Sequence, residues 1–408
     1  MEKQLKPAIR FKGFTDPWEQ RKLGEVADIV GGGTPSTENP EYWDGDIDWY
    51  APAEIADQIY VHTSQRKITE QGYDNSSAKL LPPGTVLFTS RAGIGKTAIL
   101  ARKGCTNQGF QSIVPHKDKL DSYFIFSRTE ELKRYGEFVG AGSTFVEVSG
   151  KQMAAMDMMM PSTLQEQQTI GRLFSTLDNL ITLHQRKYDK LQVIKKAMLE
   201  KMFPQNGSNV PEIRFRGFTD PWEQRKLGDI ADIVGGGTPS TDNSSYWDGD
   251  IDWYAPAEIA DQIYADSSQR KITDSGYENS SAKMLPPGTV LFTSRAGIGK
   301  TAILTRKGCT NQGFQSIVPH CGELDSYFIF SRTEELKRYG ELVGSGSTFI
   351  EVSGKQMAAM NLMMPSTMQE QQTIGQFFSD LDHLITLHQR ELEKLQKIKK
   401  AMLEKMFV

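Results

Sequence analysis

The 408-residue chain contains little cysteine, only three residues. Cys105 and Cys309 stand 204 positions apart in matching surroundings, Cys321 has Lys117 at the corresponding place, and no CxxC pair or Cys/His cluster occurs in the sequence. This scarcity excludes a disulfide scaffold and leaves no pattern of zinc ligands. We therefore expect free structural thiols and no metal bound by this chain.

Long apolar runs and a strong charge of one sign are lacking as well. No apolar run approaches the ~18 residues of a membrane span, and the first ten residues, MEKQLKPAIR, lack the apolar core of a signal peptide. The sequence therefore predicts a cytoplasmic protein. The net charge is −4 and the pI about 6.0, which excludes a uniformly basic nucleic-acid-binding surface but leaves room for a local basic face.

Almost the whole chain consists of two copies of one sequence repeat. Residues 9–203 align with residues 213–407 without a gap, and roughly 30 of about 195 paired positions differ. Each copy begins with short β-prone runs and glycine turns, a texture that predicts a globular α/β body. Each copy ends in a segment, 162–203 in the first, where glycine occurs only at Gly171 and apolar residues recur every three or four positions. That segment predicts one long helix.

The predicted helix carries a seven-residue repeat. The repeat positions are Ile170, Leu177, His184, Leu191 and Met198 in the first copy, and Ile374, Leu381, His388, Leu395 and Met402 in the second. A strict seven-residue repeat needs a partner helix to cover it, and the only segment of matching length and spacing is the other copy. We predict that the two helices pair antiparallel. His184 and His388 are interpreted as hydrogen-bonded packing residues rather than metal ligands, and the methionine-rich run 153–160 as adaptable packing.

The stretch SRAGIGKT occurs at residues 90–97 and again at 294–301. It partly matches the nucleotide-binding loop GxxxxGK[ST], which must open a helix whose N-terminus faces the phosphates. The residues that follow, 97–100, are instead β-prone, and so are residues 86–89 before it. The pattern therefore favours a hairpin with Arg91 and Lys96 near its tip. A nucleotide-dependent enzyme is the weaker alternative.

The order of the remaining motifs is specific. It runs GGGTPST, YWDGDIDWYAP, LPPGTVLFTSRAGIGKTAIL, NQGFQSIVP, GSTFVEVSGKQM, PSTLQEQQTIGRLFSTLDNLI and KKAMLEKMF. This series, present in two copies from about residue 9 onward, resembles the specificity (S) subunit of type I restriction-modification systems. The resemblance implies an α/β fold: two tandem mixed α/β target recognition domains, each followed by a long helix, with the two helices pairing as an antiparallel coiled coil.

The resemblance also implies domain bounds and partners. Target recognition domains would cover residues 1–161 and 213–365, spacer helices 162–204 and 366–408, and a linker 205–212. The chain would be a non-catalytic subunit that reads a bipartite site in double-stranded DNA and docks two methyltransferase subunits, to which two restriction subunits can be added. S-adenosylmethionine, ATP and magnesium are expected on those partners. The sequence agrees, since it contains no NPP[FY] tetrapeptide and no nuclease-type carboxylate cluster.

Reading DNA requires cations for phosphates and arginine or planar amides for base edges. The candidate DNA-binding residues are Arg91, Lys96, Arg102, Lys103, Asn107, Gln108 and Gln111, with Arg295, Lys300, Arg306, Lys307, Asn311, Gln312 and Gln315 in the second copy. We expect them to share one face. As alternatives, Asn107 and Gln108 could satisfy turn amides and Lys103 could be a solvated charge. Trp43, Trp49 and Tyr50 are assigned to packing rather than base stacking.

The two target recognition domains, here called heads, are nearly identical, so we expect them to read two identical half-sites. An antiparallel helix pair relates the heads by a pseudo-twofold axis, so we expect an interrupted palindrome with one adenine methylated in each half, on opposite strands. The copies differ at 61–63 against 265–267 and at 117–119 against 321–323, which we expect to be exposed loop positions. An alternative function is a solitary DNA-recognition module that acts without partners.

Overall fold

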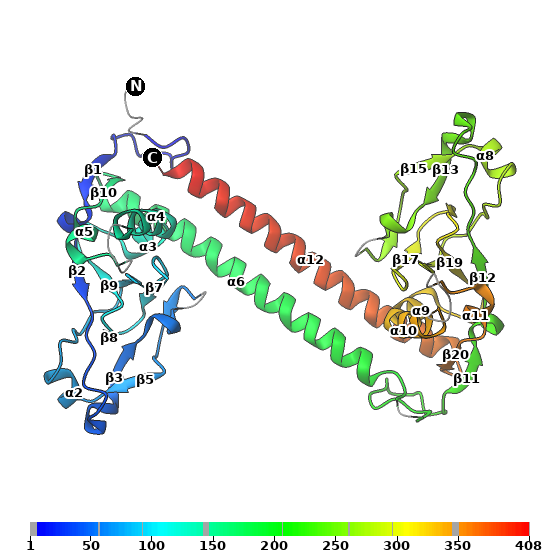
Figure 1. Cartoon of the computed structure of the whole chain (residues 1–408), viewed down its shortest axis with the longest axis horizontal. Helices are drawn as coiled ribbons and strands as arrows, with labels where there is room; N and C mark the ends of the chain where they lie inside the picture. Colours follow the sequence, from blue (N-terminus) through cyan, green and yellow to red (C-terminus); the bar gives the residue numbers. More distant parts are fainter. Residues whose placement is uncertain are drawn as a thin grey trace. The chain divides into compact units, whose positions relative to one another are not determined.

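The structure, a computed structural model (Figure 1), describes residues 6–55, 58–91, 93–141, 147–205, 207–259, 262–295, 297–344 and 351–407. The chain divides into two units, the first made of Met1–Gln185 with Arg390–Val408, the second of Arg186–Gln389. Each unit therefore combines one globular body with a portion of both long helices. The secondary structure of the second body repeats that of the first.

The elements follow the same order in both copies. In the first they are β1 (Glu19–Lys22), α1 (Leu23–Val26), β2 (Ala27–Gly31), η1 (Pro40–Tyr42), β3 (Trp43–Tyr50), η2 (Pro52–Glu54), β4 (Tyr60–Val61), β5 (Arg66–Ile68), α2 (Glu70–Asp74), β6 (Val86–Phe88), β7 (Thr97–Leu100), β8 (Cys105–Thr106), β9 (Gln111–Pro115), α3 (Ser122–Phe126), α4 (Thr129–Gly140), α5 (Gly150–Ala154), β10 (Asp157–Met160) and α6 (Leu164–Lys201). In the second they are β11 (Glu223–Lys226), α7 (Leu227–Ile230), β12 (Ala231–Gly235), η3 (Ser244–Tyr246), β13 (Trp247–Tyr254), η4 (Pro256–Glu258), β14 (Tyr264–Ala265), β15 (Arg270–Ile272), α8 (Asp274–Glu278), β16 (Val290–Phe292), β17 (Thr301–Leu304), β18 (Cys309–Thr310), β19 (Gln315–Pro319), α9 (Ser326–Ser331), α10 (Thr333–Gly344), α11 (Gly354–Ala358), β20 (Asn361–Met364) and α12 (Met368–Met406).

Three sheets organise the described part of each body. In the first, a five-stranded sheet has the order β2-β9-β6-β7-β4, a three-stranded sheet the order β5-β3-β8, and β1 pairs with β10. Strands β6 and β7 are antiparallel, whereas β4 and β7 are parallel. These mixed sheets, together with helices α3, α4 and α5, confirm the predicted mixed α/β class.

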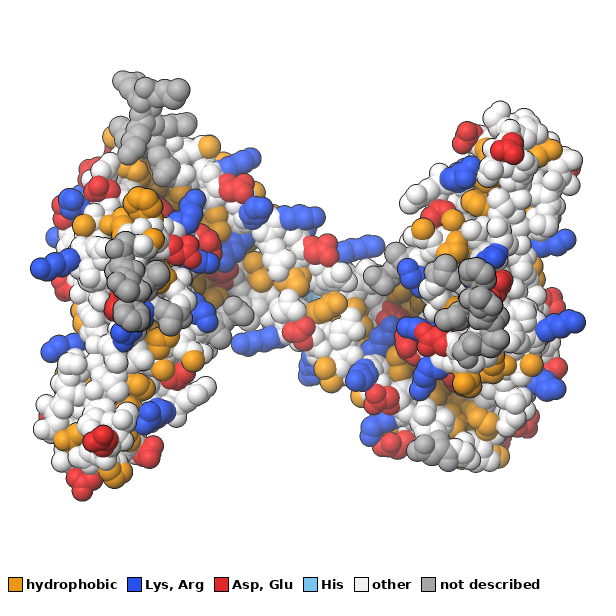
Figure 2. Space-filling model, viewed as in Figure 1, with side chains coloured by type: hydrophobic (Ala, Val, Ile, Leu, Met, Phe, Trp, Pro, Cys, Tyr) orange, Lys and Arg blue, Asp and Glu red, His pale blue; other side chains and the backbone are white. Residues whose placement is uncertain are grey.

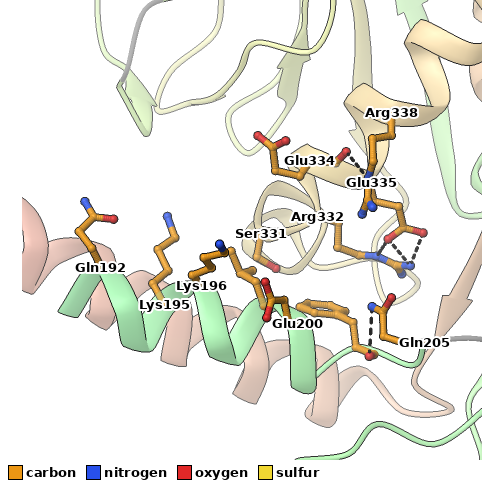
Figure 3. Close-up of a pocket in the computed structure, with 12 residues that line it drawn as sticks. Gln192, Lys195, Lys196, Glu200, Gln205, Ser331, Arg332, Glu334, Glu335 and Arg338 are labelled. Atoms are coloured by element: carbon orange, nitrogen blue, oxygen red, sulfur yellow. Dashed lines mark hydrogen bonds and ion pairs between the residues drawn. The ribbon is translucent and has the colours of Figure 1, made fainter. Parts of the chain in front are cut away.

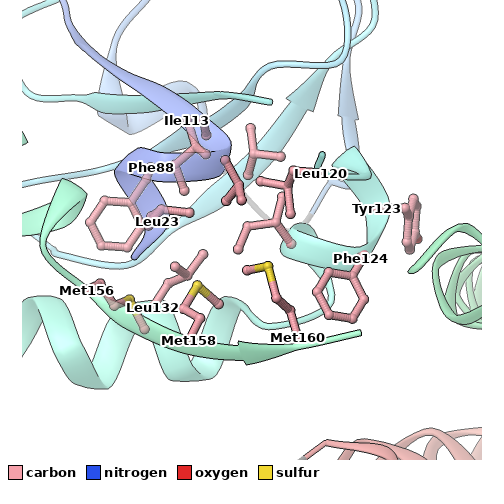
Figure 4. Close-up of a cluster of buried hydrophobic side chains, with 14 of the residues drawn as sticks. Leu23, Phe88, Ile113, Leu120, Tyr123, Phe124, Leu132, Met156, Met158 and Met160 are labelled. Atoms are coloured by element: carbon pink, nitrogen blue, oxygen red, sulfur yellow. The ribbon is translucent and has the colours of Figure 1, made fainter. Parts of the chain in front are cut away.

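The largest core of the first unit lies between the five-stranded sheet, the short helices and β10 (Figure 4). Met153, Met156, Met158 and Met160 are each at most 2% exposed, which confirms that the methionine run is packing. Methionine suits this place because its unbranched, polarisable side chain fills irregular gaps between elements of different geometry. Helix α4 contributes Leu132 and the strands contribute Phe88 and Ile113 to the same core.

The long helices α6 and α12 have 38 and 39 residues, as the heptad pattern predicts. In the first unit, Phe174 of α6 stacks on Phe407, which follows α12, with ring centroids 5.7 Å apart. Asp178 of α6 forms an ion pair with Lys399 of α12 at 2.5 Å. Later residues of α6 thus meet earlier residues of α12, so the helices run antiparallel there.

The second unit repeats this arrangement with the helices exchanged. Phe203, which follows α6, stacks on Phe378 of α12 at 6.0 Å, and Lys195 pairs with Asp382 at 2.6 Å. Each unit by itself therefore confirms the predicted antiparallel pairing.

One expectation about the positions that differ between the copies is wrong in part. Val61 and Ala265 are 1% and 0% exposed, because they lie in β4 and β14 and point into a core rather than standing in a loop. His62 and Thr63 are exposed, and so are residues 117–119.

All three cysteines are free thiols, and Cys105 and Cys309 are buried, as predicted for structural thiols. Cys321 is exposed, so the structural part of the prediction is wrong for this residue. Burial raises the pKa of Cys105 to about 12 and that of Cys309 to about 11. None of the described helices is both long enough and apolar enough to span a bilayer.

Candidate nucleic-acid interface

The SRAGIGKT stretch forms the turn of the β6–β7 hairpin, as predicted. Thr89 organises the turn: its backbone N–H donates to the Lys96 carbonyl at 3.0 Å, and its oxygens accept from the backbone N–H groups of Gly95 and Lys96 at 3.0 Å each. Gly93 and Gly95 have φ of 106° and 96°, a left-handed conformation that favours glycine. Ala92 lies outside the described residues. The loop is followed by a strand, so it lacks the helix N-terminus that a nucleotide phosphate requires.

The segment 107–111 lies against the triple glycine at residues 31–33. A Cβ atom on Gly32 would stand 1.9 Å from the Asn107 carbonyl oxygen, so only glycine fits there. The Asn107 side-chain oxygen accepts from the Gly109 N–H at 2.8 Å, which is the turn role considered for this residue. Thr34 donates its hydroxyl to the Gln108 side-chain oxygen. Gln111 begins β9 and is half-buried.

These two segments meet. The Ser90 N–H donates to the Gly109 carbonyl at 2.8 Å, and in the second unit Arg295 Nη2 donates to the Gln312 carbonyl at 2.7 Å. The hairpin turn and the amide segment therefore form one surface, here called the hairpin-tip surface. It comprises Thr34, Arg91, Lys96, Gln108 and Glu147 in the first unit, and Thr238, Arg295, Lys300, Gln312 and Glu351 in the second.

Glu147 was not anticipated from the sequence. Its carboxylate lies 3.8 Å from Arg91 Nη1, and Glu351 lies 3.9 Å from Arg295 Nη1. All four side chains are more than a third exposed, so water weakens the pairs and each contributes little to stability. An anionic group such as a phosphate is chemically able to take the place of the carboxylate as the partner of the arginine. Lys96 is exposed at the same end of the hairpin.

Arg102 and Lys103 lie at the other end of β7. All four residues of β7 are buried, and a strand of this length spans roughly 13 Å. The candidate residues therefore fall into two groups rather than one cluster. Lys103 is exposed, in agreement with either a phosphate contact or a solvated charge.

Arg102 is held by a buried carboxylate. Asp48 is 4% exposed and accepts hydrogen bonds from the Ser64 N–H at 3.0 Å and the Ser64 hydroxyl at 3.1 Å. Lys67 Nζ and Arg102 Nε lie 3.6 and 3.5 Å from its two oxygens. Asp48, Ser64, Lys67 and Arg102 are here called the Asp48 cluster. The equivalent residues of the second unit, Asp252, Ser268, Lys271 and Arg306, are called the Asp252 cluster. In the second unit Arg306 Nε is 2.9 Å from Asp252.

The pKa of Asp48 reflects this setting. Burial by itself raises it, but the hydrogen bonds from Ser64 and the charge of Lys67 outweigh burial and lower the pKa below its ordinary value. The carboxylate is therefore ionised at neutral pH. Because the Arg102 side chain is still 56% exposed, the cluster presents a pre-positioned cation to solvent.

The tryptophans pack, as predicted. Trp43 and Trp49 are 7% and 5% exposed, with ring centroids 5.1 Å apart in an edge-on arrangement. The Arg66 guanidinium lies 3.6 Å above the Trp43 ring, so that face is already occupied. Tyr50 is 1% exposed, and burial raises its pKa.

A pocket of about 620 Å³ lies in the second unit between the end of α6 and helices α9 and α10 (Figure 3). Basic residues Lys195, Lys196 and Arg338 line it together with acidic Glu200 and Glu334. Mixed signs also characterise the visible surface, where acidic and basic side chains are interspersed (Figure 2). Among the described residues, no group of three or more His, Cys, Asp or Glu is placed to hold a metal ion.

Comparisons with known proteins give an independent assignment. The family of type I restriction modification DNA specificity domains matches residues 15–193 and, a second time, residues 219–397. The chain is 36% identical over 230 residues to the MjaIX type I restriction enzyme specificity subunit of Methanocaldococcus jannaschii. That alignment covers 54% of this chain and 52%, about half, of the relative. The MjaVIII specificity subunit of the same organism is 19% identical over 412 residues, with 95% of this chain and 91% of the relative covered.

A solved structure has the same fold. The S subunit of a type I restriction-modification system from M. genitalium superposes with a TM-score of 0.62 at 13% identity, covering 99% of each chain. This likeness confirms the prediction of two tandem mixed α/β bodies, each followed by a long helix.

Proposed function

The chain belongs to the family of type I restriction modification DNA specificity domains, as its motif order predicted, and we propose that it reads a bipartite site in cytoplasmic double-stranded DNA. Each globular body would read one half-site. The hairpin-tip surface supports this role, because it offers exposed cations beside planar amides, the groups that contact phosphates and base edges. The paired helices would set the distance between the half-sites.

The observation that carries the proposal further is the identity of the two surfaces. Residues 88–100 and 102–116 recur unchanged at 292–304 and 306–320, so the two hairpin-tip surfaces would present the same side chains to DNA. If the antiparallel helix pair relates the two heads by a pseudo-twofold axis, the half-sites would lie on opposite strands. The target would be an interrupted palindrome with one methylated adenine in each half.

The chain would supply recognition, and its partners the chemistry. We assign residues 1–161 and 213–365 to target recognition, 162–204 and 366–408 to spacer helices, and 205–212 to a linker. Two methyltransferase subunits would dock on this chain and carry S-adenosylmethionine. Restriction subunits, where present, would bring ATP and magnesium.

Methylome sequencing of cells that express the chain with its partners tests this function. The expected result is one interrupted motif, identical on both strands when read 5′ to 3′, with a fixed spacer. Two unrelated half-sites would refute the palindrome while leaving the DNA-reading function intact. Absence of any methylated motif, together with failure to co-purify a methyltransferase, would favour a solitary DNA-binding module.

A further inference from the structure

The two heads carry different side chains around an equivalent arginine, Arg102 in the first unit and Arg306 in the second. Four differing positions gather there: 61, 62, 63 and 101 in the first unit, against 265, 266, 267 and 305 in the second. They meet because β4 lies parallel to β7 with Val61 opposite Leu100, and the Ala101 N–H donates to the Val61 carbonyl at 3.0 Å. Sequence differences that stand about 40 residues apart in each copy thus form one patch beside the Asp48 cluster.

In the first unit this patch leaves the arginine shared between two acceptors. Arg102 Nε donates to the His62 backbone carbonyl and also lies 3.5 Å from Asp48 Oδ2. Thr63 donates its hydroxyl to the other Asp48 oxygen at 3.2 Å. His62 is exposed, and its side chain adds no negative charge to the patch.

In the second unit the same patch contains an additional carboxylate. Asp266 replaces His62, is exposed, and accepts a hydrogen bond from the Thr305 hydroxyl at 2.7 Å. Thr305 immediately precedes Arg306, and Arg306 Nε is 2.9 Å from Asp252 Oδ2, closer than Arg102 is to Asp48. The Asp252 cluster, with cations Lys271 and Arg306, therefore has a second carboxylate, Asp266, bonded to the residue next to Arg306. The Asp48 cluster has one carboxylate for Lys67 and Arg102.

We propose that His62 and Asp266 make the two heads unequal DNA readers, with the first head contacting the phosphate backbone more strongly than the second. This rests on the proposed function. Both heads would recognise the same bases, because the hairpin-tip surfaces are identical, and they would differ in electrostatic affinity. A phosphate at Arg306 would approach beside the additional charge of Asp266, which is bonded to the neighbouring Thr305, whereas a phosphate at Arg102 meets the neutral or positive His62 at that position. A single unit charge a few ångströms away through solvent corresponds to about three- to fivefold in affinity and about one unit in the salt slope.

The test measures affinity of the full chain, with the subunits that co-purify with it, for a duplex carrying one half-site and a duplex carrying both. Asp266→Asn keeps the shape of the side chain and removes its charge. It is expected to raise affinity for the two-half-site duplex about three- to fivefold and to steepen the salt dependence by about one unit. His62→Asp is expected to weaken both duplexes, since the stronger head is then lost.

The exchange variant His62→Asp with Asp266→His is the matched control, because it moves the charges between heads without changing their sum. It should restore the two-half-site affinity of the unchanged protein. His62→Asn tests shape alone and should leave the salt slope as it was. Unchanged affinity and slope in Asp266→Asn would overturn the proposal, provided the unchanged protein binds the duplex. If the unchanged protein does not bind DNA at all, the proposed function itself fails, which is a distinct result.

Discussion

The two units have the same elements and equivalent cores, but the residues that complete these cores come from different places in the chain. In the second unit, Phe203 at the end of α6 packs against Trp222, Phe328 and Phe378. In the first unit, Phe407 at the end of α12 packs against the equivalent rings of Trp18, Phe124 and Phe174. Each body is thus completed by the helix of the other repeat. The two repeats therefore depend on each other, because the core of each body needs a phenylalanine from the other repeat.

Replacing Phe203 or Phe407 by alanine is expected to have the largest effect, because it would destabilise one unit and leave the other intact. Phe407→Ala should destabilise the first unit by about 3–5 kcal/mol, the usual cost of removing a packed phenylalanine, while the second unit keeps its protection. Phe203→Ala should do the reverse. Hydrogen exchange read by mass spectrometry over residues 6–141 and 207–344 distinguishes the units. Val193→Ala, at a side chain that is 68% exposed, is the control. Equal loss in both units from either variant would contradict this dependence.

Removing the buried aspartates of the long helices is the next largest change. Asp178 accepts from the Tyr123 hydroxyl at 2.9 Å and pairs with Lys399 at 2.5 Å, and Asp382 does the same with Tyr327 and Lys195. Asp178→Ala leaves the tyrosine without its acceptor and should cost about 2 kcal/mol. Guanidinium unfolding with a unit-specific probe measures it.

Lys399→Met serves as the comparison for that experiment. It keeps the tyrosine–aspartate hydrogen bond and removes a cation that is a third exposed, so a smaller loss is expected. A larger loss from Lys399→Met than from Asp178→Ala would show that the ion pair, and not the tyrosine contact, joins α3 to the helix pair.

The arginines of the hairpin-tip surfaces, Arg91 and Arg295, allow the two units to be compared by their contribution to DNA binding. Because Arg91 and Arg295 each pair weakly with an equivalent glutamate, Arg91→Ala and Arg295→Ala should each reduce the salt slope of DNA binding by about one unit, and the double variant by about two. Titrations at several salt concentrations check this. Lys6→Ala, outside both surfaces, is the control. An unchanged slope in the double variant would remove the hairpin tip from the interface.

The thiols give the smallest effect and distinguish the units chemically. Burial raises the pKa of Cys105 to about 12 and of Cys309 to about 11, so both remain protonated and covered at pH 8. Only exposed Cys321, at the position of Lys117, should react rapidly with a thiol reagent. Labelling followed by peptide mapping should find the modification in the second unit. Fast labelling at Cys105 would show that the first unit opens.

Local patterns in the sequence predicted the elements well, and non-local pairing explains what they missed. The heptads predicted α6 and α12, and the glycine spacing predicted the β6–β7 hairpin, because each depends on neighbouring residues. The partnership of Asp48 and Arg102 depends instead on strands β3, β5 and β7 folding around one point. The burial of Val61 has the same origin, since β4 pairs with a strand 39 positions later in register. Periodicity does not encode which strands become neighbours.

The position of Phe407 also has a consequence for synthesis. The first body emerges from the ribosome long before the residue that covers Trp18, Phe124 and Phe174, because Phe407 follows Phe174, the last of these rings, by 233 positions. At about 5–20 residues per second, that delay is on the order of 10–50 s. The second body has no such delay, since Phe203 is already made when its own strands appear. The head that is translated first is therefore the last to be completed, and during that interval its aromatic surface is open to chaperones or to aggregation.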